Sequence, residues 1–163
     1  MTARALIRLA LVVLLLCRAG VSLGEDTIAV IVGDAPPHIA LDRSTLADIF
    51  LKRIEVDNDG KAIVPLNLSS TNPLRIAFSL ALFGKGPQGL QRYWTERYFQ
   101  GVSPPYTVAS QESMLRFVAR TPGAIGYVAA CRADARTKVV ARLPVPPALA
   151  SVLRRLCGRG ASP

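Results

Sequence analysis

The chain has 163 residues, half of them hydrophobic, and its 20 Lys and Arg against 11 Asp and Glu give a formal net charge of +9. This length suffices for one ordinary domain and excludes a second. A single histidine, His38, and the lack of a closely spaced cysteine pair argue against a metal site, and we expect no cofactor.

Residues 1–24 have the pattern of a secretory signal peptide. Two arginines flank a wholly apolar run over 9–16, and the segment 18–24 is small and polar enough for processing. The apolar run is short for a membrane span, which disfavours a retained anchor. We expect cleavage after Gly24, which leaves one domain over residues 25–163 in a periplasmic or secreted protein.

The positive charge gathers near the C-terminus. Cleavage after residue 24 removes three arginines and leaves 17 basic and 11 acidic side chains, a net charge of about +6. The basic residues of the last third are Arg132, Arg136, Lys138, Arg142, Arg154, Arg155 and Arg159. Such a basic tail can bind anionic lipid or nucleic acid. Because nucleic acid is an improbable partner for an exported protein, we interpret it as a solvated face.

Two cysteines, Cys131 and Cys157, remain after cleavage. An even number in an oxidising compartment favours a disulfide. In the chain-entropy model this bond would stabilise the fold by about 3 to 4 kcal/mol and hold the C-terminal segment. Two separate buried thiols are the alternative, because the sequence does not show how far apart the two Cα atoms lie.

The first elements are a strand, a loop and a helix. TIAVIVG, residues 27–33, is a continuous β-branched run that predicts a strand covered on both faces. The proline-rich segment that follows predicts a loop. Ser44 is expected to cap a helix that reaches about Arg53. The inner face of this helix is formed by Leu46, Ile49 and Phe50.

The stretch 63–83, IVPLNLSSTNPLRIAFSLALF, carries the main functional prediction. It reads as a buried strand, a hydroxyl-rich turn over 69–72, and a helix whose first residue is Pro73. The backbone N–H groups at the start of such a helix attract an oxyanion. The candidate anion ligands are Ser69, Ser70, Thr71, Asn72 and Arg75. The alternative is an ordinary capped helix with a solvated arginine.

The next elements are helix, strand and helix. Pro87 is well placed to begin a helix, and we interpret its aromatic stripe as core rather than as a ligand-stacking surface. The stripe consists of Leu90, Tyr93, Trp94 and Tyr98. A short strand is expected over 106–109, and Ser110 then caps a helix with Glu112 in its first turn. The inner face of that helix is formed by Met114, Leu115, Phe117 and Val118.

The last elements complete an α/β pattern. AIGYVA, residues 124–129, predicts a buried strand in which Gly126 indicates close approach by another backbone or a ligand. TKVVARL suits an edge strand, and a final helix begins after Pro147. This alternation predicts a three-layer α/β sandwich with a mostly parallel sheet. Ligands of such sheets bind outside the carboxyl ends of strands, and the turn over 69–72 is such a place.

Five phrases taken together resemble the phosphate-binding proteins of ABC transporters, which belong to the type 2 periplasmic binding protein superfamily. The phrases are STLADIF at 44–50, the strand and hydroxyl turn at 63–72, Trp94, FQG at 99–101 and TPGAIGYV at 121–128. The similarity covers residues 27–130. Members of that family have two α/β lobes that close on a solute, and the resemblance implies a single lobe, the central one.

The resemblance also bears on the site. The family's phosphate loop pairs an arginine with an Asp and a Ser-Gly-Thr run, whereas the corresponding positions here read LNLSSTN. By this comparison Ser69, Ser70 and Thr71 stand in for the hydroxyl donors, and Arg75 offers a compensating charge from the helix. Asn67 is the nearest polar residue before the turn.

The function implied by the resemblance is an exported, non-catalytic solute-binding domain for phosphate or a similar oxyanion, with a membrane transporter or receptor as a possible partner. An open single lobe would bind the anion no better than millimolar. No serine lies in a recognisable nucleophile motif and no carboxylates show catalytic pairing, so we expect no enzyme. The alternative is a periplasmic protein-interaction or sensory accessory domain that has lost solute binding.

Overall fold

The computed structural model describes residues 27–158, and the predicted signal peptide lies outside the described residues. The strands are β1 (Thr27–Val32), β2 (Val64–Leu68), β3 (Tyr106–Val108), β4 (Ala124–Ala129) and β5 (Lys138–Pro144). The helices are α2 (Arg43–Phe50), α3 (Pro73–Phe83), α4 (Gln91–Phe99), α5 (Gln111–Arg120) and α6 (Pro147–Gly158). Two 3-10 turns are η1 (Pro87–Leu90) and η2 (Ala130–Arg132).

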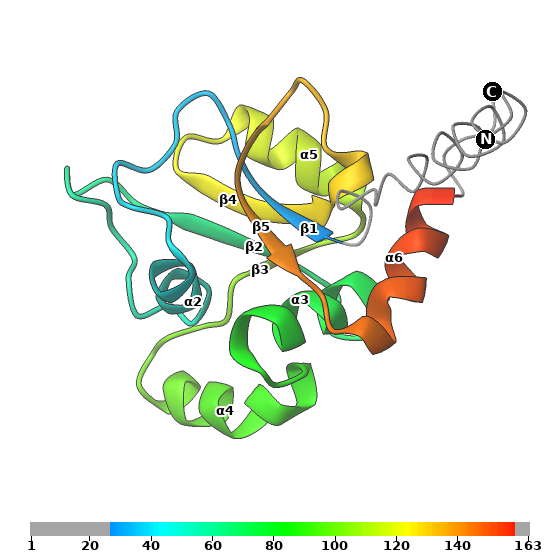
Figure 1. Ribbon diagram of the computed structural model, residues 1–163. Helices are drawn as coiled ribbons and strands as arrows, with labels where there is room; N and C mark the ends of the chain where they lie inside the picture. Colours follow the sequence, from blue (N-terminus) through cyan, green and yellow to red (C-terminus); the bar gives the residue numbers. More distant parts are fainter. Residues whose placement is uncertain (1–26, 159–163) are drawn as a thin grey trace, which may run out of the picture.

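The five strands form one sheet in the order β3-β2-β4-β1-β5. Strand β2 is parallel to both β3 and β4, whereas β1 is antiparallel to both β4 and β5. Four strands therefore run in one direction and β1 runs in the other. Helix α5 covers one face, and α2, α3 and α6 lie on the opposite side (Figure 1). The predicted three-layer α/β sandwich with a mostly parallel sheet is confirmed, and β5 is the predicted edge strand.

Strand β4 shows how the two faces of the sheet are filled. Gly126 faces α5: a Cβ added there would lie 2.4 Å from Met114 Sδ and 2.9 Å from Val118 Cγ2. The close approach at Gly126 is therefore made by the side chains of α5, which corrects the expectation of another backbone or a ligand. The next residue, Tyr127, faces the other layer and stacks on Phe78 of α3, with ring centroids 3.7 Å apart. A glycine and a tyrosine thus fit one strand between two layers of helices.

Helix α2 differs from its prediction at both ends. Its N-cap is Asp42, two residues before the expected Ser44. The Asp42 carboxylate accepts the Thr45 N–H at 2.8 Å and the Ser44 hydroxyl at 2.7 Å, and these hydrogen bonds lower the pKa of Asp42. A charged acceptor binds a helix N–H more strongly than a hydroxyl does. The helix ends at Phe50, before the expected Arg53.

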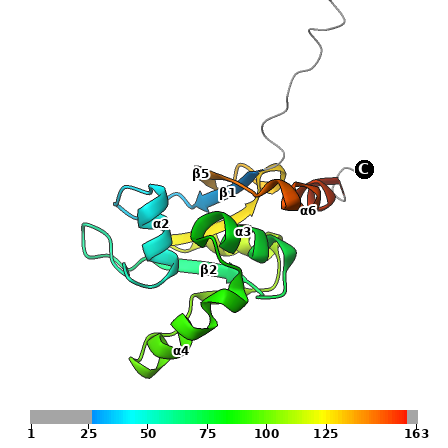
Figure 2. The ribbon, with the colours of Figure 1, turned by 60° about the horizontal axis from the view of Figure 1, so that its bottom comes forward.

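The aromatic stripe of α4 is not core, which corrects the prediction. Leu90 is buried, but Tyr93 and Trp94 are only half-buried, and Tyr98 is 68% exposed. Helix α4 projects from the body of the domain (Figure 2), so the far end of its stripe has no layer to pack against. On α5, Phe117 is likewise 39% exposed. The buried residues of α5 are Met114, Leu115 and Val118, and Phe117 lies at the margin of the helix face that they form.

A disulfide joins Cys131 of η2 to Cys157 of α6, with the two Cα atoms 5.8 Å apart. The alternative of two separate thiols does not hold. Helix α6 contributes the fully buried Leu153 to the core. Between residues 27 and 158, no helix combines the length and the apolar character that a membrane span requires.

Candidate functional site

The predicted hydroxyl turn lies at the edge of the sheet where three parallel strands end. The register pairs Leu68 of β2 with Val108 of β3, so the chain leaves both strands at the same edge. After β2 it forms the turn and enters α3, and after β3 it enters α5. Ser69, Ser70 and Thr71 are all exposed. The turn therefore presents its hydroxyl groups to solvent, as the predicted binding of an oxyanion there requires.

Hydrogen bonds within the turn give it a defined shape. The Ser69 carbonyl accepts the Asn72 N–H at 2.9 Å, and the Ser69 and Thr71 hydroxyls lie 3.1 Å apart. Asn72 is the N-cap of α3, and its side-chain oxygen accepts the Leu74 N–H at 2.9 Å. The predicted first helical residue, Pro73, is confirmed, and the cap is the last residue of the predicted turn. Because the cap occupies the Leu74 N–H, an oxyanion here would depend on the hydroxyls and the other amides of the turn.

Arg75 is buried directly behind the turn. Its guanidinium donates a hydrogen bond to the Asn67 side-chain oxygen, which also accepts the Tyr127 hydroxyl at 3.3 Å. The Tyr127 hydroxyl in turn accepts the Leu68 N–H at 3.1 Å. Burial raises the pKa of Tyr127, and the nearby Arg75 charge opposes that rise. The alternative of a solvated arginine is wrong: the positive charge lies beneath the turn, held by the strand that precedes it.

The start of α5 at the same edge has a different electrostatic character. Glu112, in its first turn, forms a double hydrogen bond with Arg136 at 2.7 and 2.9 Å, and Arg136 also binds Asp134. Arg136 lowers the pKa of both carboxyls, so each stays ionised. Arg116 also pairs with Glu112 at 3.6 Å, so two carboxylates and two guanidiniums balance each other beside α5 and occupy the acidic side chain of its first turn. The first turn of α3 has no acidic residue, which makes it the better place for an anion.

Sequence reasoning missed both of these clusters. Tyr127 is 60 residues from Asn67, and Arg136 is 24 residues from Glu112. Their partners are brought together by strand pairing and by the return of the chain after β4, which no local spacing encodes. The one signal available was the polar Asn67 inside an otherwise apolar strand, since a buried amide requires hydrogen-bond partners.

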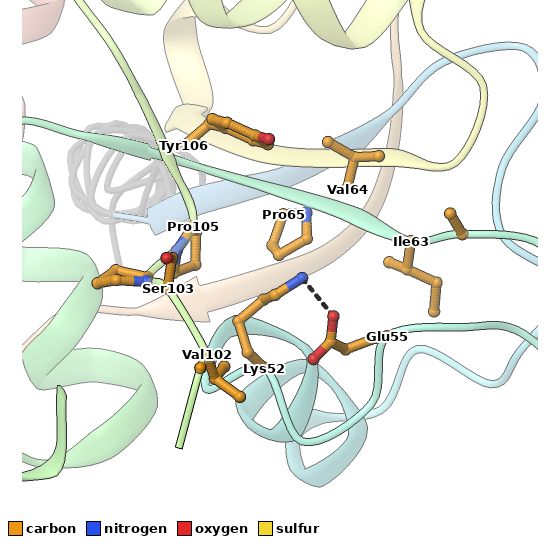
Figure 3. A pocket seen from close by; sticks show the side chains of 12 residues that line it. Lys52, Glu55, Ile63, Val64, Pro65, Val102, Ser103, Pro105 and Tyr106 are labelled. Carbon is orange, nitrogen blue, oxygen red and sulfur yellow. Dashed lines mark ion pairs between the residues drawn. The ribbon is translucent and has the colours of Figure 1, made fainter. Parts of the chain in front are cut away.

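A separate pocket of about 470 Å³ lies near the amino-terminal end of β2, away from the turn. Figure 3 shows Ser103 and Pro105 at the left of the pocket, Ile63 and Val64 at the right, and the Lys52–Glu55 ion pair, 2.9 Å long, below. Because these two charges neutralise each other, the pocket has no charge to spare for an oxyanion. It does not coincide with the predicted site.

No group of three or more His, Cys, Asp and Glu side chains between residues 27 and 158 could hold a metal ion. His38 is exposed and its ring nitrogen lies 3.2 Å from an Asp59 oxygen. Its backbone N–H donates to Asp57, so this region organises a surface hairpin.

The three layers, with the hydroxyl turn at the edge where the parallel strands end, form one α/β lobe. No family model matches the chain, and no curated protein matches it in sequence. An ABC-type phosphate transport receptor from Vibrio cholerae shares the fold, with a TM-score of 0.57 and 21% identity over 71% of this chain and 45% of the receptor.

A second solved structure is a putative phosphate ABC transporter substrate-binding protein from Clostridium perfringens, crystallised with bound phosphate. Its TM-score is 0.56 and its identity 19%, over 71% of this chain and 44% of that protein. The fold is thus that of phosphate ABC transporter substrate-binding proteins. The match covers less than half the length of either neighbour, which is consistent with a single lobe.

Proposed function

We propose that this chain is an exported, non-catalytic solute-binding domain whose ligand is phosphate or a similar oxyanion. The observation that carries the proposal is the exposed turn Ser69–Thr71, with three consecutive hydroxyls at the positive end of α3. The Clostridium perfringens neighbour, which holds phosphate, supports this choice of ligand. The residues of the proposed anion site are Ser69, Ser70, Thr71, Asn72 and Arg75.

Arg75 has a distinct part in this proposal. Its guanidinium is already hydrogen-bonded to Asn67. We therefore propose that Arg75 attracts the anion by its positive charge from beneath the turn and does not contact it directly. The hydroxyls and amides of the turn supply the contacts. A charge in a partly buried position is screened less by solvent than an exposed one, so Arg75 favours the anion without leaving the core.

The proposed affinity is low. A helix N-terminus at the surface contributes about 0.3 to 1 kcal/mol to holding a negative charge. The exposed hydroxyls compete with water for the anion, and the chain corresponds to less than half of a two-lobed receptor. We expect dissociation constants in the millimolar range for the lobe alone. A membrane transporter or receptor that covers the turn would raise the affinity.

Thermal unfolding in the presence of phosphate or sulfate tests this function. We expect the unfolding midpoint to rise with phosphate, because a ligand that binds only the folded state stabilises it. Asn72→Asp keeps an acceptor for the Leu74 N–H but adds a negative charge at the site, and it should remove the response. Asn58→Asp makes the same chemical change on the exposed surface hairpin and should retain it. No shift of the unmodified protein up to tens of millimolar would exclude free anion binding.

A protein-interaction or sensory accessory domain is the second candidate. The observation that favours it is the pair of exposed aromatics at the end of α4, where Tyr98 is 68% and Phe99 84% exposed. Large apolar side chains in such a position suit a contact with another protein. Light scattering over a broad concentration range tests self-association, and a monomer throughout would exclude a homodimer formed through this surface.

A further inference from the structure

A second concave region lies at the other end of α3 from the hydroxyl turn. It occupies about 470 Å³ between α2, the C-terminal end of α3, and α4, within the range of small-molecule sites. The 11 residues of α3 separate it from the turn by about 15 Å. Its apolar lining consists of Ala47, Leu51, Leu82, Phe83 and Leu90. We name this region the α4 cavity.

The charged side chains of the α4 cavity are mostly positive. They are Arg53, Lys85, Arg92 and Glu96. Lys85 and Arg92 are exposed and take part in none of the ion pairs found between residues 27 and 158. Glu96 takes part in none of them either, so these three side chains leave the cavity with one positive charge in excess beside an apolar floor. A ligand that supplies a negative charge next to an apolar body would complement both features.

The walls of the α4 cavity are held in place before any ligand arrives. The Tyr93 hydroxyl donates to the Leu51 carbonyl at 2.6 Å, and the Arg97 guanidinium donates to the Lys52 carbonyl at 3.2 Å. These bonds tie α4 to the segment after α2. The Arg53 guanidinium is fixed by Asp48 at 3.1 Å and lies 5.5 Å from the centroid of the Tyr93 ring. A preformed cavity reduces the entropy lost on binding.

We propose that the α4 cavity binds a small amphiphilic anion, with its apolar body on the leucine floor and its acidic group between Lys85 and Arg92. A bare inorganic anion would leave the apolar lining in contact with water. A neutral apolar molecule would leave the two cations unpaired. The α4 cavity is distinct from the hydroxyl turn, and its ligand does not depend on the oxyanion function.

Paired fluorescent probes test the charge requirement. The probes are 8-anilinonaphthalene-1-sulfonate and N-phenyl-1-naphthylamine, which share an aromatic body but differ in the sulfonate. The double variant Lys85→Gln/Arg92→Gln should weaken binding of the sulfonate probe about tenfold and leave the neutral probe unaffected. The variant Arg142→Gln/Arg155→Gln removes the same charge elsewhere on the surface and should change neither affinity. Equal sulfonate affinity in both double variants would overturn the proposal.

A variant that fills the α4 cavity tests the location. Ala47→Leu places a larger side chain on the floor and should abolish binding of both probes, while circular dichroism shows that the variant remains folded. If Ala47→Leu is unfolded, Ala47→Val provides the same measurement with a smaller change. Undiminished binding by either folded variant would place the probes elsewhere and contradict the proposal. Inorganic phosphate should not displace the sulfonate probe from the α4 cavity. The probe experiment can therefore fail while phosphate still binds at the hydroxyl turn, and the reverse.

Discussion

Asn67 connects the end of a strand to the start of the next helix through one side-chain oxygen. That oxygen accepts from Arg75 of α3 and from Tyr127 of β4, all three residues being buried or nearly so. A shared acceptor holds the guanidinium and the phenol in fixed positions beneath the turn. The charge of Arg75 therefore lies beneath the hydroxyl groups without the side chain having to be exposed.

Removing the Tyr127 hydroxyl should destabilise the protein. Tyr127→Phe leaves the buried Leu68 N–H without its acceptor, and such an unsatisfied donor costs about 1 to 3 kcal/mol. Urea unfolding measures the loss. Tyr106→Phe, which removes the hydroxyl of an exposed tyrosine on β3, is the matched control and should leave stability unchanged. Equal stability of the two variants would contradict the role given to the buried network.

Tyr127 should also make the free energy of unfolding fall at alkaline pH. Burial raises the pKa of Tyr127 in the folded state. A group with a raised folded pKa contributes stability that is fully present below its unfolded pKa, about 10 for tyrosine, and is lost as pH rises through the folded value. Unfolding curves of the unmodified protein should therefore show a decline above about pH 10 that is smaller in Tyr127→Phe.

At the scale of elements, the disulfide holds α6 against the domain. The bond joins residues 26 positions apart, for which the chain-entropy model gives about 3 to 4 kcal/mol. Cys131→Ser/Cys157→Ser should lose stability of this order in urea unfolding. A reducing agent should lower the stability of the unmodified protein to that of the double variant and should leave the variant itself unchanged. An unmodified protein insensitive to reduction would contradict this account.

Local signals explain which elements could be predicted from the sequence. Helix α3 follows from Asn72 and Pro73, because a capping side chain and a first-turn proline act on the adjacent backbone. The exposure of Tyr98 did not follow, because helical spacing shows a stripe but not whether another layer covers it. The reversed direction of β1 did not follow either, since the β-branched run TIAVIV suits burial beside parallel and antiparallel neighbours alike.

At the scale of the whole molecule, the candidate site was predictable only in part. The hydroxyl turn was anticipated because its residues are consecutive in the chain. The environment of Arg75 was not, because its partners lie on β2 and beneath α3. The α4 cavity was not anticipated either, since its lining comes from three separate helices and the segments between them.

The size of the lobe limits the affinity for phosphate that can be expected. The chain matches less than half the length of either neighbour. An anion at Ser69–Thr71 would keep much of its contact with water. The lobe alone should therefore hold phosphate weakly and exchange it rapidly, and a tighter complex requires a partner that closes over the turn.

Amide chemical-shift mapping during a phosphate titration tests the oxyanion site most directly. The account predicts that the largest shifts fall on the backbone N–H groups of residues 69–72 and of Leu74 and Arg75, that they saturate in the millimolar range, and that Asn72→Asp removes them. Shifts confined to other parts of the surface, or no shifts up to tens of millimolar phosphate, would contradict it.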